Sequence, residues 1–140
     1  MMKLDHLRIP VTDLDRSRRW YVATLGLTVE FEVPDRKTVA LQDSGGFTIF
    51  LHEIASAVHP EGLALWFQVA DVEASFADLA AREVKLVHGP RKSYWGYGVE
   101  LKDPDGHLVR LWDERSMNSR GGAGAAPPPD PPTGPGFRPG

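Results

Sequence analysis

The sequence predicts an α+β protein made of two tandem βαβββ modules, and internal repetition is the main reason. LDHLRIPVTDLD over residues 4–15 corresponds to GLALWFQVADVE over residues 62–73. Each stretch is an alternating strand that ends in an aspartate, Asp13 or Asp71, and each is followed by a helical pattern. The two aspartates are 58 positions apart.

A second correspondence follows at nearly the same offset. DSGGFTIFLHE over residues 43–53 matches DPDGHLVRLWD over residues 103–113, with Gly46 and Gly106 separated by 60 positions. Both stretches predict a turn followed by a strand. Because the two offsets agree, one structural unit is repeated along the chain, and each unit consists of a strand, a helix and three strands.

The first module begins with an alternating strand, and Asp13 is the expected N-cap of the helix that follows. Gly26 supplies the signal that ends this helix. The expected elements of this module, strand, helix and three strands, cover residues 3–11, 13–25, 27–33, 37–42 and 46–53.

In the second module Asp71 takes the place of Asp13 as the expected N-cap. The corresponding elements cover residues 62–69, 71–82, 85–88, 96–102 and 107–113. The predicted folded domain is therefore 1–115, with modules of about 1–55 and 60–115. We expect 116–140 to be a disordered Gly/Pro-rich tail, because GGAGAAPPPDPPTGPGFRPG cannot bury enough apolar surface to order itself.

Composition excludes several classes of function. The chain has 140 residues, with 16 Lys and Arg against 19 Asp and Glu, and a formal net charge of −3. A slightly acidic chain is not expected to bind nucleic acid, and no apolar run is long enough to span a membrane. It has no cysteine and therefore no disulfide, thiolate ligand or cysteine nucleophile. The start of the chain lacks an apolar signal core, so we expect a cytoplasmic protein.

Three stretches in this order resemble the vicinal oxygen chelate superfamily, which includes glyoxalase I, extradiol dioxygenases and fosfomycin and bleomycin resistance proteins. They are DHLRIPVTDLDRSRRWYVATLGL, FQVADVEAS and WGYGVELKDPDGHLVRLWD. The resemblance covers about residues 3–114. It implies the glyoxalase/bleomycin-resistance fold, a curved mixed sheet around a cleft, which is usually assembled as a homodimer.

The resemblance also implies positions for metal ligands, and most of them are lost here. His6 matches the ligand on the first strand, but Ala64 occupies its counterpart in the second module. Arg110 stands where metal-binding members carry Glu, and Phe50 is its counterpart in the first module. Alanine and phenylalanine offer no lone pair, and a guanidinium repels a divalent cation. We therefore expect no metal at the usual site and no cofactor.

Strand alternation predicts which side chains face the cleft. Arg8 and Arg110 are candidates to bind a carboxylate or phosphate, and Glu100 to meet an amine or to balance an arginine. In a purely structural interpretation, Glu100 and Arg110 form an ion pair and the tryptophans fill the sheet interface. The expected cleft residues are His6, Arg8, Thr48, Phe50, His52, Ala64, Trp66, Gln68, Gly98, Glu100, Lys102, Leu108, Arg110 and Trp112, with Trp95 in a loop over the rim.

His6 is the candidate acid or base, with Glu100 and Arg110 as its catalytic partners, and the alternative is that it is a relic of a metal site. A displaced set of His6, His52 and Glu100 is a further possibility for a metal. His59 and His107 resemble loop and turn residues and receive no role.

The leading hypothesis is a metal-independent small-molecule-binding protein, similar to bleomycin resistance proteins. Its ligand would be aromatic or cationic, such as an antibiotic or another natural product, because the predicted cleft is lined by aromatic residues. The predicted contacts are Arg8, Phe50, His52, Trp66, Gln68, Trp95 and Trp112. The alternatives are a metal-independent lyase or isomerase that uses His6, and a metal-dependent lyase or dioxygenase with displaced ligands.

Overall fold

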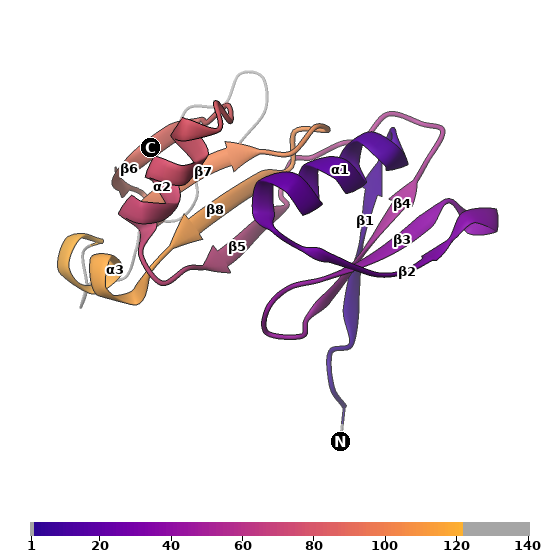
Figure 1. The fold of residues 1–140 in the computed structure, drawn as a ribbon, viewed down its shortest axis with the longest axis horizontal. Helices are drawn as coiled ribbons and strands as arrows, with labels where there is room; N and C mark the ends of the chain where they lie inside the picture. The colour runs from indigo at the N-terminus through magenta and orange to yellow at the C-terminus, as the bar shows by residue number, and fades with distance from the viewer. Residues whose placement is uncertain (1, 122–140) are drawn as a thin grey trace. The chain divides into compact units, whose positions relative to one another are not determined.

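The computed structural model describes residues 2–121, which form two compact units. The first unit contains the residues up to His59 together with Asp103–Gly106, and the second contains Pro60–Lys102 and the residues from His107 onward. Figure 1 traces the elements of each unit, and each is described by itself below. No helix among residues 2–121 is long and apolar enough to cross a membrane.

The first unit is a four-stranded mixed sheet with one long helix. Its strands are in the order β1-β4-β3-β2, with β1 parallel to β4 and the other neighbours antiparallel. Helix α1 packs against β3 and β4. Its elements are β1 (His6–Val11), α1 (Leu14–Leu25), β2 (Thr28–Val33), a 3₁₀ turn (Pro34–Arg36), β3 (Thr38–Gln42) and β4 (Thr48–Glu53).

The second unit repeats this plan, as the offsets in the sequence predict. Its strands are in the order β5-β8-β7-β6, with β5 parallel to β8. Helix α2 packs against β6 and β7, and a short third helix packs against β7. The elements are β5 (Ala64–Gln68), α2 (Val72–Ala81), β6 (His88–Ser93), β7 (Gly96–Lys102), β8 (Leu108–Trp112) and α3 (Glu114–Arg120).

Each core lies on one face of its sheet, because successive side chains of a strand point to opposite faces. On β1 the alternate residues Ile9 and Val11 are buried, whereas His6 and Arg8 are exposed. The buried apolar residues of the strands and helices include Ile9, Val11, Tyr21, Val39, Leu41 and Leu51 in the first unit, and Leu65, Val72, Leu79, Val99, Leu101, Val109 and Leu111 in the second.

The expected N-caps are present at the start of both long helices. The Asp13 side chain accepts a hydrogen bond from the backbone N–H of Arg16 at 3.0 Å. The Asp71 side chain accepts from the backbone N–H groups of Glu73 and Ala74. These bonds satisfy donors that have no partner inside the helix, which explains why an alternating strand gives way to a helix directly after each aspartate.

A second carboxylate reaches each helix start from the end of the last strand in the same unit. Glu53 accepts from the backbone N–H of Leu14 at 2.9 Å, and Asp113 accepts from that of Val72 at 2.6 Å. Asp113 also accepts from the backbone N–H of Ser116 and is the N-cap of α3. Burial opposes ionisation of Asp113, but these backbone hydrogen bonds outweigh it and hold the pKa of its carboxyl below the usual range.

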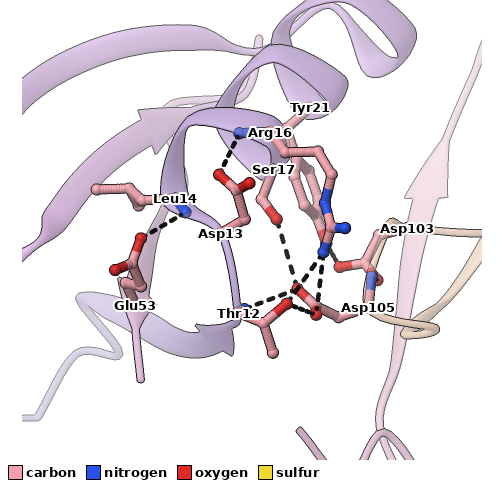
Figure 2. Close-up of polar contacts among 9 residues, drawn as sticks. All are labelled: Thr12, Asp13, Leu14, Arg16, Ser17, Tyr21, Glu53, Asp103 and Asp105. Atoms are coloured by element: carbon pink, nitrogen blue, oxygen red, sulfur yellow. Dashed lines mark hydrogen bonds and ion pairs between the residues drawn. The ribbon is translucent and has the colours of Figure 1, made fainter. Parts of the chain in front are cut away.

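The Asp-Pro-Asp-Gly turn belongs to the first unit, where two aspartates receive hydrogen bonds around the start of α1 (Figure 2). Asp105 accepts from the backbone N–H of Thr12 at 3.1 Å and from its hydroxyl at 2.5 Å. Asp103 accepts from the buried phenol of Tyr21 at 2.7 Å. Burial, together with the charge of Asp103, raises the pKa of Tyr21, so this phenol remains a donor.

The predicted strand over residues 85–88 is displaced in the structure, where β6 covers His88–Ser93. Gly89 and Pro90 indicate a turn in the sequence, but the structure accommodates them at a register shift between His88 and Arg91. The loop expected to carry Trp95 over the rim is a two-residue turn at Tyr94 and Trp95, between β6 and β7.

The end of the predicted domain also differs from the structure. The sequence places the start of the tail at residue 116, whereas α3, which Asp113 caps at its start, covers Glu114–Arg120. Residues 122–140, which make up the rest of the predicted tail, lie outside the described residues. His107 precedes β8 as expected of a turn residue, but it is buried.

Candidate functional site

One row of four side chains crosses the whole second sheet on the face opposite the core. The strand register pairs His88 of β6 with Glu100 of β7, Glu100 with Arg110 of β8, and Arg110 with Trp66 of β5. Directly paired residues on neighbouring strands project from the same face of a sheet. The sequence alternation predicts this face for Glu100, Arg110 and Trp66, and the register places them there together.

Arg110 is the centre of this row, and its side chain is only 1% exposed. Its Nε donates to Glu100 Oε1 at 2.8 Å, and its Nη2 donates to the Tyr94 hydroxyl at 2.6 Å. A buried guanidinium needs such partners, because removing its charge from water is costly. The structure therefore favours the ion-pair interpretation of Glu100 and Arg110 and gives Arg110 a role in organising the residues around it.

Aromatic rings surround this guanidinium. Its carbon lies 5.4 Å from the ring centroid of Trp66, 5.4 Å from that of Tyr94 and 5.2 Å from that of Trp95. The rings of Trp66 and Trp95 meet edge to face with centroids 5.0 Å apart. Trp95 is 4% exposed, but Trp66 is 44% exposed, which is high for so large an apolar residue. The cluster thus presents one aromatic surface to its surroundings.

Gly98 makes room for the Trp95 ring on β7. A Cβ at position 98 would lie 2.8 Å from Trp95 Cη2 and 2.1 Å from the backbone oxygen of Leu111. Any side chain there would displace the ring or the neighbouring strand. The small residue that the sequence places on this face is therefore part of how the aromatic cluster is built.

Gln68 and Trp112 extend the same face beyond the aromatic cluster. Their backbones are paired between β5 and β8, two residues along from the pair formed by Trp66 and Arg110. Neither residue makes any of the contacts described above for the guanidinium of Arg110. They remain predicted ligand contacts at one edge of the face.

The first sheet carries the remaining predicted site residues on its corresponding face. Arg8 pairs with Phe50 and is exposed. The His6 ring stacks on the Phe50 ring at 4.1 Å with an interplanar angle of 17°, and Phe31 contacts Phe50 edge to face at 5.6 Å. His6 Nδ1 lies 2.9 Å from the carboxylate of Asp5. This unit therefore presents a smaller ring cluster with an imidazole whose orientation Asp5 supports.

Two members of the predicted set of His6, His52 and Glu100, the two histidines, belong to the first unit. His6 pairs with Thr48, and His52 lies four residues further along β4, a distance of about 13 Å along a strand. His52 Nδ1 is instead within 3.0 Å of the Thr38 hydroxyl. In the first unit His52 therefore contacts Thr38, whereas the His6 ring stacks on Phe50.

The residues at the four metal-ligand positions of the family do not suit a metal ion in this chain. Ala64 and Phe50 have no donor atoms, and Arg110 places a buried cation where a carboxylate would be needed. In residues 2–121, no group of three or more His, Cys, Asp or Glu side chains is arranged to hold a metal. His6 is the one residue at these four positions with a suitable donor.

Sequence reasoning missed His88 and Tyr94. His88 was placed at the end of a strand over 85–88, and this boundary error hid its pairing with Glu100. Tyr94 is not among the predicted site residues, although its hydroxyl accepts from Arg110. The aromatic run Tyr-Trp-Gly-Tyr over residues 94–97 was the signal that could have found it. An arginine on the same sheet, such as Arg110, is expected to contact aromatic rings of this kind.

Residues 3–111 match the sequence model of the Glyoxalase/Bleomycin resistance protein/Dioxygenase superfamily. The chain belongs to this superfamily. The uncharacterized protein YraH of Bacillus subtilis strain 168 is 29% identical over 126 residues, which cover 79% of this chain and 98% of YraH.

Solved structures agree with this assignment. The antibiotic binding protein TnmS3 from Streptomyces sp. CB03234 is 25% identical with a TM-score of 0.68, over 81% of this chain and 96% of TnmS3. Lactoylglutathione lyase from Agrobacterium tumefaciens is 20% identical with a TM-score of 0.63, over 81% and 94% of the two chains. The latter likeness concerns the fold alone. Solved structures with this fold therefore include an antibiotic binding protein and a lactoylglutathione lyase.

Proposed function

We propose that this superfamily member is a small-molecule-binding protein that holds an aromatic or cationic ligand without the usual metal. The observation that carries the proposal is the exposed ring of Trp66 above a guanidinium that Glu100 neutralises. An exposed aromatic surface backed by a rigid buried cluster suits a flat ligand, because stacking buries a large apolar area and little side-chain entropy is lost.

The polar groups of the second sheet support binding rather than catalysis. Glu100 and Arg110 bond to each other, and Tyr94 takes a further donor of Arg110. Groups engaged in this way hold the rings in place, whereas a general acid or an oxyanion donor must be able to reach the substrate. The similarity to TnmS3 also supports the proposal, since TnmS3 is an antibiotic binding protein with the same fold.

Tryptophan fluorescence with a panel of flat compounds tests the proposal. The panel contains proflavine as an aromatic cation, anthraquinone as a neutral ring system and anthraquinone-2-sulfonate as an anion. Saturable quenching that Trp66→Leu abolishes is the expected result. Trp20→Phe is the matched control, because it also removes one of the four tryptophans but changes helix α1 of the first unit. Quenching that survives in Trp66→Leu would contradict the assignment of the site.

A second candidate, a metal-independent lyase or isomerase, is favoured by the pairing of His6 with Asp5 at 2.9 Å. A carboxylate on Nδ1 orients an imidazole and leaves Nε2 for proton transfer. The two functions differ in stoichiometry. A binding protein returns its ligand chemically unchanged after extraction, whereas an enzyme converts many equivalents and loses that activity in His6→Ala.

Two further features belong to the proposal. Metal content measured by mass spectrometry, before and after incubation with Fe, Mn, Ni and Zn, is expected to stay far below one ion per chain. Near-stoichiometric metal that disappears in His6→Ala would instead support a metal-dependent enzyme with displaced ligands.

We also propose a homodimer, which light scattering at known protein concentration tests.

A further inference from the structure

Two nitrogen atoms in the aromatic cluster of the second sheet are buried without a hydrogen-bond partner among the described residues. They are Nε2 of His88 and Nε1 of Trp95. Both residues are at least nine-tenths buried, with exposures of 9% and 4%. A buried polar atom that loses water and gains no partner is destabilising, so most such atoms in native proteins have one. These two nitrogens therefore indicate a position for a group that the chain does not supply.

The two nitrogens have different hydrogen-bonding roles, one as an acceptor and the other as a donor. His88 Nδ1 lies 2.7 Å from the carbonyl oxygen of Gly89, and because a carbonyl only accepts, Nδ1 carries the proton. In the neutral ring, Nε2 then carries a lone pair and accepts. The indole N–H of Trp95 can only donate. A hydroxyl group can both donate and accept, so its chemistry suits either nitrogen.

Their place in the fold links them to the aromatic surface. The rings of His88 and Trp95 stack with centroids 6.1 Å apart and an interplanar angle of 25°. His88 belongs to the row that contains Glu100, Arg110 and Trp66, and Trp95 contacts the Trp66 ring. The unpartnered donor and acceptor therefore lie in the same ring cluster as the exposed indole.

We propose that His88 and Trp95 form a polar subsite that recognises a hydroxyl group on a neutral aromatic ligand. The inference rests on the proposed function, because it names the ligand class of the same aromatic surface. A neutral ring is favoured over a cation because the Arg110 guanidinium is already the cation–π partner of both rings, 5.4 Å from the Trp66 centroid and 5.2 Å from that of Trp95.

Equilibrium dialysis with three matched probes tests the subsite. 2-Naphthol can donate and accept, 2-methoxynaphthalene can only accept, and naphthalene can do neither. We expect 2-naphthol to bind the wild-type chain at least about 5-fold more tightly than naphthalene, the gain that two net hydrogen bonds give. Methoxynaphthalene is expected to fall between them, because it keeps the bond from Trp95 alone.

The variants divide the subsite into its halves. His88→Phe keeps a ring but removes the acceptor, and Trp95→Phe keeps a ring but removes the donor. In each variant the ratio of naphthol to naphthalene affinity, measured on that same variant, is expected to fall below the wild-type ratio without reaching one, because the other nitrogen of the subsite remains. His59→Phe, a change at an exposed histidine of the first unit, is expected to leave the naphthol preference intact. Should His88→Phe fail to fold, the same probes on Trp95→Phe decide the question.

The outcomes distinguish the two proposals. If all three probes bind the wild-type chain equally and Trp66→Leu abolishes their binding, the subsite is wrong and the aromatic surface stands. That result would mean that water satisfies the two nitrogens. If none of the probes binds, the proposed function fails for flat neutral ligands and the subsite fails with it.

Discussion

Removing the charge of Glu100 is expected to destabilise the protein strongly. The Glu100 side chain is 12% exposed, and its carboxylate lies 2.8 Å from Nε of a guanidinium that is 1% exposed. Two unit charges about 4 Å apart attract by about 4 kcal/mol at an effective dielectric constant of about 20. Breaking one half of a buried pair typically costs about 3–5 kcal/mol, because the remaining charge stays buried without compensation.

We expect Glu100→Gln to lower the free energy of unfolding by about 2–4 kcal/mol, because the amide oxygen still accepts one hydrogen bond. Urea unfolding followed by circular dichroism measures the change. Asp78→Asn is the matched control, since Asp78 pairs with Arg82 at the same 2.8 Å but in an exposed helix position. That control is expected to cost less than about 0.5 kcal/mol. Equal costs for the two variants would refute the burial argument.

Three further predictions concern other contacts. Asp113→Ala is expected to cost about 2–4 kcal/mol, because one buried carboxylate caps two helices, and denaturant unfolding measures it. Folding lowers the pKa of Asp113, so its carboxylate stabilises the protein fully above its unfolded pKa of about 4 and loses this effect as the pH falls through the folded pKa. The free energy of unfolding of Asp113→Ala is therefore expected to lack this part of the pH dependence at low pH. Asp105→Ala removes an acceptor for both polar groups of Thr12 and is expected to cost about 2–3 kcal/mol in the same assay, whereas no loss would mean that water replaces the carboxylate. Tyr94→Phe keeps the ring beside Arg110 but loses the hydroxyl that accepts from Arg110, and the expected cost is about 1–2 kcal/mol in the free energy of unfolding. Thermal unfolding measures it, and an unchanged midpoint would mean that this hydrogen bond does not stabilise the protein.

The architecture was predictable from the sequence because it depends on local signals that repeat. Asp13 and Asp71 each end an alternating strand and begin a helix, and the structure confirms both caps. Alternation also determines the face of a residue within a regular strand, so the common face of Glu100, Arg110 and Trp66 was predictable, and the structure confirms it. Such inferences need no knowledge of packing.

The details of the aromatic cluster were not predictable in this way. His88 belongs to a strand with a register shift near Gly89 and Pro90, where the alternation is interrupted and local turn signals are misleading. Trp95 was expected at the rim of a cleft, yet it is buried on Gly98 because the absent side chain leaves space for the ring. That fit depends on the distance between neighbouring groups in three dimensions, which no pattern along the chain encodes.

The central claim is that the aromatic surface at Trp66 binds a small molecule without a metal ion. Its most direct test is the dissociation constant of a hit from the flat-ligand panel, measured with chelator-treated wild-type protein and with Trp66→Ala. The account predicts unchanged affinity after chelation and binding at least about tenfold weaker in Trp66→Ala, a difference of about 1.4 kcal/mol. Binding that disappears on chelation and returns with added metal, or that is indifferent to the loss of the Trp66 ring, would contradict it.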